Sequence, residues 1–264
     1  QRGTAVQVHA APVTCEPVCD REPVNHGVVV VHEEAPVRSV AIDGDEIVAG
    51  APGTRVDLNN GAGAIYIYRR SKFTPWTLSQ EILNPNPLPG EINGANFGFS
   101  VDVVKQVVYP RAPTGNFYYL IGAPRDTSEV AGGEVYMFGG GNSGYQRFRR
   151  PGGGAANEGF GHAVTFRDDL ISGNHLFLVS TSVQQTGDVY LYDQPDFPDP
   201  WQAVSTIDIP DTDVSPGATA IIGEAVAAWG DFVAVSTSNL SIGNDAVYTD
   251  LVPIMYSGFE AVDD

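Results

Sequence analysis

The sequence predicts an all-β protein that contains about four copies of a four-stranded antiparallel unit. Three observations support this fold class. The chain has 264 residues, of which 30 are Gly and 19 are Pro, so residues that interrupt regular structure are frequent. Four short sequence elements recur in the same order about four times. Each element is rich in β-branched and aromatic residues and is bounded by Gly, Asn, Asp or Pro, as short strands are.

The first two elements are a Phe-Gly pair followed by a short apolar run, and an apolar run that ends in small residues. The first element occupies residues 97–101 and 160–164, is weaker at 222–226 and is eroded at 39–42. The second element ends in Gly-Ala-Pro at 50–52 and 122–124, and in Ser-Thr-Ser at 180–182 and 236–238. Both elements have the length of a buried strand.

The third element carries a recurring tyrosine, and the fourth carries an aromatic residue with alternating polarity. The third occupies residues 63–68, 133–138, 187–192 and 245–248, and the fourth occupies 76–83, 145–148 and 201–207. Because the tyrosine recurs at one structural position, we expect it to pack between units, with sugar stacking as the alternative. Its four copies are Tyr66, Tyr136, Tyr190 and Tyr248.

Turn chemistry and burial together predict a β-propeller. Asp43-Gly44-Asp45 and Trp229-Gly230-Asp231 separate the first and second elements, as tight hairpin turns would. A lone four-stranded sheet cannot bury both faces, whereas sheets packed around an axis can. We therefore expect four-stranded antiparallel blades, about four to five in number, in a ring that can be incomplete. The expected repeats span residues 36–92, 93–155, 156–216 and 217–264, and residues 1–35 form an N-terminal segment that adds one strand.

These motifs resemble those of the FG-GAP family, the repeat of integrin α-subunit propellers and of many bacterial surface proteins. Phe97-Gly98 with Gly122-Ala123-Pro124 is a complete pair, and the resemblance covers about residues 36 to 250. It implies a propeller that often holds Ca²⁺ in an Asp-rich loop between the first two strands. This sequence departs from that pattern, because the turn after Asp43 is short and the insertion at 104–117 contains no acid. We therefore expect no cofactor and no metal, with Ca²⁺ as the less favoured alternative.

Composition restricts the classes of partner. The formal net charge is −18, which disfavours nucleic acid and anionic membrane surfaces, and no apolar run is long enough to insert in a membrane. Scarce lysine and this acidity favour an extracellular or cell-surface location. Cys15 and Cys19 are close enough for a short-range disulfide, with two free thiols as an equal alternative. The Asn239 sequon is a candidate glycosylation site in an expected exposed loop.

Candidate binding residues lie in the expected loops between the second and third strands. The loops at 53–61 and 125–132 would share one face of the propeller, where they could hold a ligand or an ion. Their polar residues are Asp57, Asn59, Asn60, Asp126 and Glu129. His162 falls at the repeat position of Phe99, so we expect it to pack rather than to catalyse.

No nucleophile elbow, phosphate loop or zinc-binding helix motif occurs, so the sequence predicts no catalytic residues. We therefore expect a noncatalytic structural or adhesive propeller that binds another protein, as a subunit of a larger surface assembly. A carbohydrate-binding propeller is the alternative, because a glycan could occupy a pocket between blades. An enzyme, or an enzyme's accessory domain, is the third class, since acid–base residues that converge in space leave no linear motif.

Overall fold

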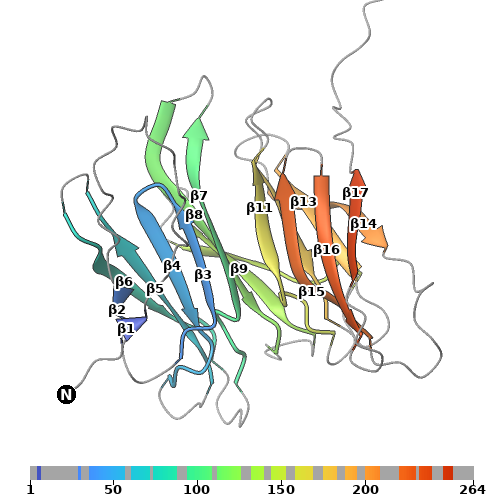
Figure 1. Ribbon diagram of the computed structural model, residues 1–264, viewed down its shortest axis with the longest axis horizontal. Helices are drawn as coiled ribbons and strands as arrows, with labels where there is room; N and C mark the ends of the chain where they lie inside the picture. Colours follow the sequence, from blue (N-terminus) through green and yellow to red (C-terminus); the bar gives the residue numbers. More distant parts are fainter. Residues whose placement is uncertain are drawn as a thin grey trace, which may run out of the picture.

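The computed structural model describes residues 5–6, 29–30, 36–56, 61–71, 74–87, 94–108, 112–125, 132–139, 144–152, 158–168, 175–182, 188–194, 200–208, 220–229, 232–239 and 246–251. Within these ranges the regular secondary structure consists of β-strands (Figure 1). The described part of the chain holds no helix that is long and apolar enough to cross a membrane.

The strands form antiparallel sheets that follow the order of the chain. Blade 1 contains β3 (Ser39–Asp43), β4 (Glu46–Ala51), β5 (Ala64–Arg69) and β6 (Thr77–Leu83). Blade 2 contains β7 (Ser100–Val108), β8 (Ala112–Ala123), β9 (Glu134–Gly139) and β10 (Tyr145–Phe148). Blade 3 contains β11 (Val164–Asp168), β12 (His175–Ser180), β13 (Asp188–Asp193) and β14 (Gln202–Asp208). Blade 4 contains β15 (Ala220–Trp229), β16 (Phe232–Asn239) and β17 (Ala246–Leu251), and a separate pair joins β1 (Ala5–Val6) to β2 (Val29–Val30).

The blades pack side by side through their first strands. Strand β3 contacts β7, β7 contacts β11, and β11 contacts β15, so that the four blades follow one another across Figure 1. This arrangement confirms the predicted all-β propeller of about four blades. The hairpin predicted at Asp43-Gly44-Asp45 joins β3 to β4, and Trp229 pairs with Phe232 where the second hairpin was expected. The insertion in the second repeat lengthens β7 and β8 rather than forming a separate loop.

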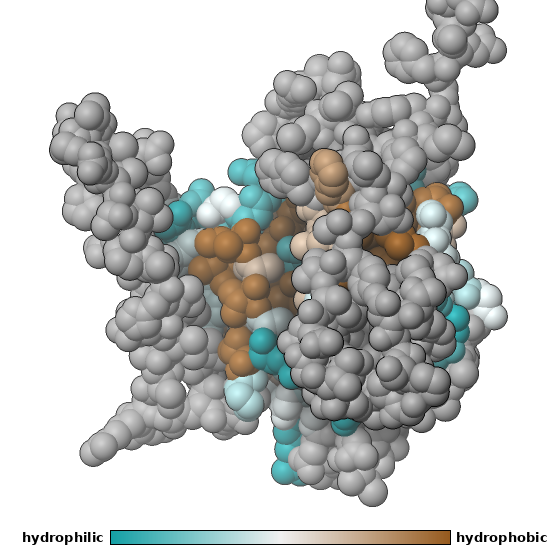
Figure 2. All heavy atoms as spheres, turned by 45° about the vertical axis from the view of Figure 1, so that its right-hand side comes forward, coloured by the Kyte–Doolittle hydropathy of each residue, from teal (hydrophilic) through white to brown (hydrophobic). Residues whose placement is uncertain are grey.

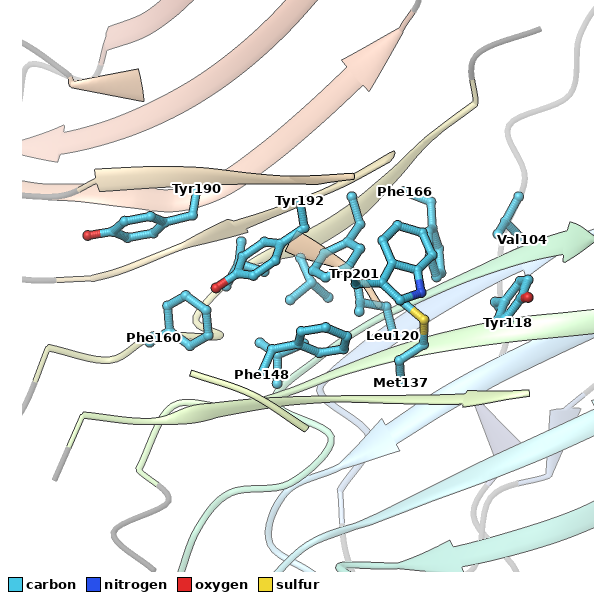
Figure 3. Close-up of a cluster of buried hydrophobic side chains, with 14 residues drawn as sticks. Val104, Tyr118, Leu120, Met137, Phe148, Phe160, Phe166, Tyr190, Tyr192 and Trp201 are labelled. Atoms are coloured by element: carbon cyan, nitrogen blue, oxygen red, sulfur yellow. The ribbon is translucent and has the colours of Figure 1, made fainter. Parts of the chain in front are cut away.

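Hydrophobic cores lie between neighbouring blades. Alternate residues of β4 and β5 face blade 2, and alternate residues of β12 and β13 face blade 4. The core between blades 2 and 3 is rich in aromatic residues (Figure 3). The Phe177 and Tyr192 rings are stacked with 4.7 Å between their centroids. The predicted packing between units is confirmed for Tyr136 and Tyr190, which belong to the cores between blades 1 and 2 and between blades 2 and 3. There they pack edge-on against Phe97 and Phe160. Each of these three cores takes residues from two neighbouring blades, so a blade alone could not bury these faces.

The two glycine motifs contact each other across each blade boundary. A Cβ atom on Gly50 would lie 2.1 Å from the carbonyl oxygen of Gly98, and one on Gly122 would lie 1.9 Å from that of Gly161. Both distances are shorter than any real contact, so a side chain at Gly50 or Gly122 would force the blades apart. The Phe-Gly and Gly-Ala-Pro motifs are therefore the two sides of one close backbone approach.

A serine hydroxyl fastens each of these boundaries. Ser39 Oγ donates to the carbonyl oxygen of Gly98 (3.0 Å) and Ser100 Oγ to that of Gly161 (2.9 Å), each reaching the next blade. Blade 3 has Ala163 at the equivalent position, and Ser180 of the paired strand supplies the hydroxyl instead, bonding to the carbonyl oxygen of Gly223 at 2.6 Å. The hydrogen bond is thus retained although the serine has moved to the neighbouring strand.

Some apolar side chains remain at the surface, and Figure 2 shows hydrophobic residues gathered on the face that it draws, with hydrophilic residues at their margins. Among the exposed large residues are Val40 and Ile42 of blade 1 and Phe232 of blade 4. Others, such as Tyr145 and Val204, lie on the outer strands of blades 2 and 3, whereas the faces between blades are buried.

Candidate functional site

The four first strands meet at a cavity of about 440 Å³, here called the axial cavity. One residue of each blade lines this cavity: Arg38, Phe99, His162 and Glu224. Each of them comes just before the part of the first strand that pairs with the second strand. These residues occupy one repeat position, since the positions that follow each of them pair with the second strand in the same way. The position thus carries a cation, an aromatic ring, an imidazole and a carboxylate in four successive blades.

Glycines set the backbone just before three of these four residues. Gly98, Gly161 and Gly223 have φ values of +87°, +91° and +79°, in the left-handed region that side chains disfavour. In blade 4 the strand register shifts between Ile222 and Val226, so Glu224 lies in a β-bulge. Bulges of this kind change the direction of a side chain, and here the change brings the carboxylate to the axial cavity.

The first three members of this set contact one another in blade order, and the fourth acts on the third through its charge. The Arg38 guanidinium lies 3.7 Å from the centroid of the Phe99 ring, and the Phe99 and His162 rings are 4.8 Å apart at 52°. The negative charge of Glu224 acts to raise the pKa of His162. The result is a row with a cation at one end, a carboxylate at the other and two rings between them.

His162 is held in its neutral form. Burial lowers its pKa, and the Arg38 charge lowers it further, while Glu224 and the backbone of Gly223 oppose this in part. Its Nδ1 atom is buried and has no hydrogen-bond partner. A neutral imidazole can accept a proton, and the buried Nδ1 atom without a hydrogen-bond partner carries a cost in free energy.

The carboxylates of Glu134 and Asp188 are hydrogen-bonded within the protein and are not site candidates. Glu134 is 1% exposed, lies 2.6 Å from Arg149 Nε, and accepts a hydrogen bond from the Tyr136 hydroxyl at 2.9 Å. Asp188 has the equivalent position in blade 3 and accepts a bond from the Tyr190 hydroxyl, whose pKa burial raises to about 12. These clusters stabilise the ends of β9 and β13.

The structure and the sequence interpretation agree on only part of this site. His162 occupies the repeat position of Phe99, as predicted, but it lines an open cavity and keeps a ring nitrogen without a partner. Arg38 and Glu224 were not predicted. The available signal was the position after the Phe-Gly glycine, which varies while its neighbours repeat.

The predicted loop and cysteine residues lie outside the described residues. They are Asp57, Asn59, Asn60, Asp126, Glu129, Cys15 and Cys19. Asn239 is the last residue of β16, paired with Ala220, rather than part of a loop. Within the described ranges, no three acidic, histidine or cysteine side chains gather as a metal site would require.

Comparison with known proteins shows a likeness of fold only. No protein-family model matches the chain, and no curated protein matches it. Among solved structures, an exo-β-1,3-galactanase from Phanerochaete chrysosporium with bound β-1,3-galactotriose is 13% identical, with a TM-score of 0.44 over 82% of this chain. The chain spans 46% of the length of that enzyme. The periplasmic gluconolactonase PpgL from Pseudomonas aeruginosa is 10% identical, with a TM-score of 0.37 over 84% of this chain and 73% of its own.

These findings correct two of the predictions. Both structures are enzymes, which contradicts the prediction of a noncatalytic adhesive propeller and the prediction that the chain is not an enzyme. A search for linear catalytic motifs could not have found the axial cavity, because the cavity takes one residue from each blade. Since no family model matches, the FG-GAP repeat type stays a prediction.

Proposed function

We propose that the axial cavity is an acid–base active site that acts on a small polar molecule. One observation carries the proposal: a single repeat position presents Arg38, Phe99, His162 and Glu224 to one cavity. Positions that only hold blades together keep similar residues from copy to copy, as the motif glycines do. A position that faces a ligand has no such constraint, and its residues can differ in each blade.

The groups present suit hydrolysis of an ester or lactone. The neutral His162 imidazole, as general base, takes a proton from a water molecule, and the water oxygen forms a bond to the carbonyl carbon. Arg38 stabilises the negative charge that develops on the carbonyl oxygen. The bond between this carbon and the leaving oxygen then breaks, and His162 returns the proton to the leaving alkoxide. Phe99 forms the wall that holds the apolar part of the substrate.

The test compares the purified chain with His162→Phe on a panel of small lactones and nitrophenyl esters. Phenylalanine is the residue that blade 2 has at this position, so the variant keeps a packing group and removes the imidazole. We expect turnover in the parent chain and a loss of about 100-fold or more in the variant, the usual contribution of a general base. Arg125→Gln changes an exposed arginine outside the cavity and serves as the control.

Unchanged unfolding temperatures would show that any loss is chemical. The proposal is overturned if the parent chain turns over none of the panel, or if His162→Phe is as active as the parent. A rate that falls as His162 takes up a proton at acidic pH would further support the assignment, because only the neutral imidazole is a base.

The repeats themselves are proposed to be of the FG-GAP type. The support is the contact between the two motifs after which that family is named: a Cβ on Gly50 would meet the carbonyl of Gly98, and one on Gly122 would meet that of Gly161. The motif residues thus take part in one recurring contact rather than occurring by chance. Gly122→Ala should therefore destabilise the protein by more than an alanine in an open turn, as measured by urea denaturation.

A further inference from the structure

The charges of the axial cavity are separated and uncompensated within the described part of the chain. Arg38 comes from blade 1 and Glu224 from blade 4, and both are exposed. Neither forms an ion pair with a described residue, although other arginines such as Arg149 and Arg150 do. Two charges of opposite sign therefore face one cavity without neutralising each other.

Phe99 leaves the Arg38 guanidinium available to a ligand. The guanidinium carbon lies 3.7 Å from the ring centroid, the distance of a cation stacked on an aromatic face. Stacking of this kind keeps the planar N–H donors directed outward, where they match the two oxygens of a carboxylate. Phe99 therefore holds the cation in place without using its hydrogen bonds.

The two rings lie between the charges. Phe99 and His162 are 4.8 Å apart, and His162 stays neutral because burial and Arg38 lower its pKa. A ligand that spans the row would meet a cation first, then two uncharged rings, then the Glu224 carboxylate. A dianion would be repelled by Glu224 and by the net charge of −18, and a dication would be repelled by Arg38.

We infer that the axial cavity takes an elongated zwitterion, with its carboxylate at Arg38, its ammonium group at Glu224 and a flat middle over Phe99 and His162. This inference rests on the proposed function for the location of the site and adds the charge pattern of the ligand. The cavity volume of about 440 Å³ is in the range of small-molecule sites, about 300 to 1,000 Å³.

Three probes of the same shape test the charge pattern. 4-(Aminomethyl)benzoate carries both charges at opposite ends of a ring, 4-methylbenzoate carries only the anion, and 4-methylbenzylamine carries only the cation. Calorimetric titration of the full chain at low salt should show that the zwitterion binds about tenfold or more tightly than either singly charged probe, which is about 1.4 kcal/mol. Salt at 1 M should remove most of this advantage.

Two variants assign the ends of the ligand. Arg38→Gln should lower the affinity of the zwitterion to that of the amine, and Glu224→Gln should lower it to that of the benzoate. Arg125→Gln and Glu81→Gln, at exposed positions outside the cavity, are the matched controls and should bind like the parent. His162→Phe should keep the selectivity for the zwitterion, because it changes neither charge.

The outcomes separate this inference from the proposed function. Selective binding without turnover overturns the active site and leaves the zwitterion inference supported. Turnover of the ester and lactone panel without charge selectivity overturns only the inference. Equal binding of the three probes, no binding of any, or equal losses in Arg38→Gln and Arg125→Gln would also overturn the inference.

Discussion

The relocated hydroxyl between blades 3 and 4 can be moved back by mutation. Ser180 is fully buried, and its Oγ donates to the Gly223 carbonyl at 2.6 Å and accepts from the Ala163 backbone N–H at 3.0 Å. Blades 1 and 2 have the reverse arrangement, with a serine on the first strand and a glycine on the second. The double variant Ala163→Ser with Ser180→Gly therefore gives blade 3 the pattern of its neighbours.

The expected energies follow from the two contacts. Ser180→Gly removes a buried hydrogen bond that contributes about 1 kcal/mol and adds backbone freedom that costs about 0.5 to 1 kcal/mol, so it should destabilise by about 2 kcal/mol. Ala163→Ser alone places a second hydroxyl beside Ser180 and should cost up to about 1 kcal/mol. In the double variant the new hydroxyl replaces the lost one. The double variant should therefore be more stable, by about 1 kcal/mol or more, than the summed effects of the two single substitutions predict.

The assay is urea denaturation of the parent chain, the two single variants and the double variant, monitored by tryptophan fluorescence. Ser39→Ala, which removes the equivalent bond in blade 1, should cost about 1 kcal/mol and calibrates the scale. A coupling energy within about 0.5 kcal/mol of zero would refute the reasoning, because independent sites add within that margin. Ser180 would then only fill space locally, and its hydroxyl would not replace the interblade hydrogen bond of the other blades.

Three further predictions concern single positions. Gly98→Ala should destabilise by about 3 kcal/mol in urea, since its Cβ would lie 2.6 Å from a backbone oxygen; Gly152→Ala, with a similar φ and open space, should cost only the strain of about 1 to 2 kcal/mol. Tyr136→Phe should cost about 1.5 to 3 kcal/mol in thermal denaturation, because it removes a buried hydrogen bond to the Glu134 carboxylate. The pKa of His162 is lower in the folded chain than in the unfolded chain, so the unfolded chain takes up the proton first as the pH falls below about 6.5. The free energy of unfolding should therefore decrease below that pH. The urea midpoints of His162→Phe should not show this decrease.

The propeller could be predicted because its blade boundaries impose the same demand four times. A glycine is required wherever two backbones approach as closely as Gly50 and Gly98 do, so the requirement appears in the sequence as a motif. The recurring tyrosine likewise reflects a packing position, seen in the contact of Tyr136 with Phe97. Sequence reveals this class of feature well, since a constraint shared by all copies leaves the same residue in each.

The axial site could not be predicted by the same reasoning. Arg38 and Glu224 are separated along the chain by most of the repeats, and each is unique at its repeat position. A search for repetition discards such positions as variable. His162 was assigned to packing because its counterpart is Phe99, although the exposed side of the same position lines a cavity.

The two kinds of position are adjacent, and this adjacency explains how a repeat fold acquires a site. Gly98 fixes the backbone against the preceding blade through its positive φ and its missing Cβ, and the next residue faces the axis. The glycine before this residue and the serine after it hold neighbouring blades together. The residue itself therefore contributes little to assembly. It is therefore free to become Arg, Phe, His or Glu at little cost in stability. A stability scan should show this directly: alanine at Arg38 or Glu224 should change the free energy of unfolding by less than about 0.5 kcal/mol, in contrast to Gly98→Ala.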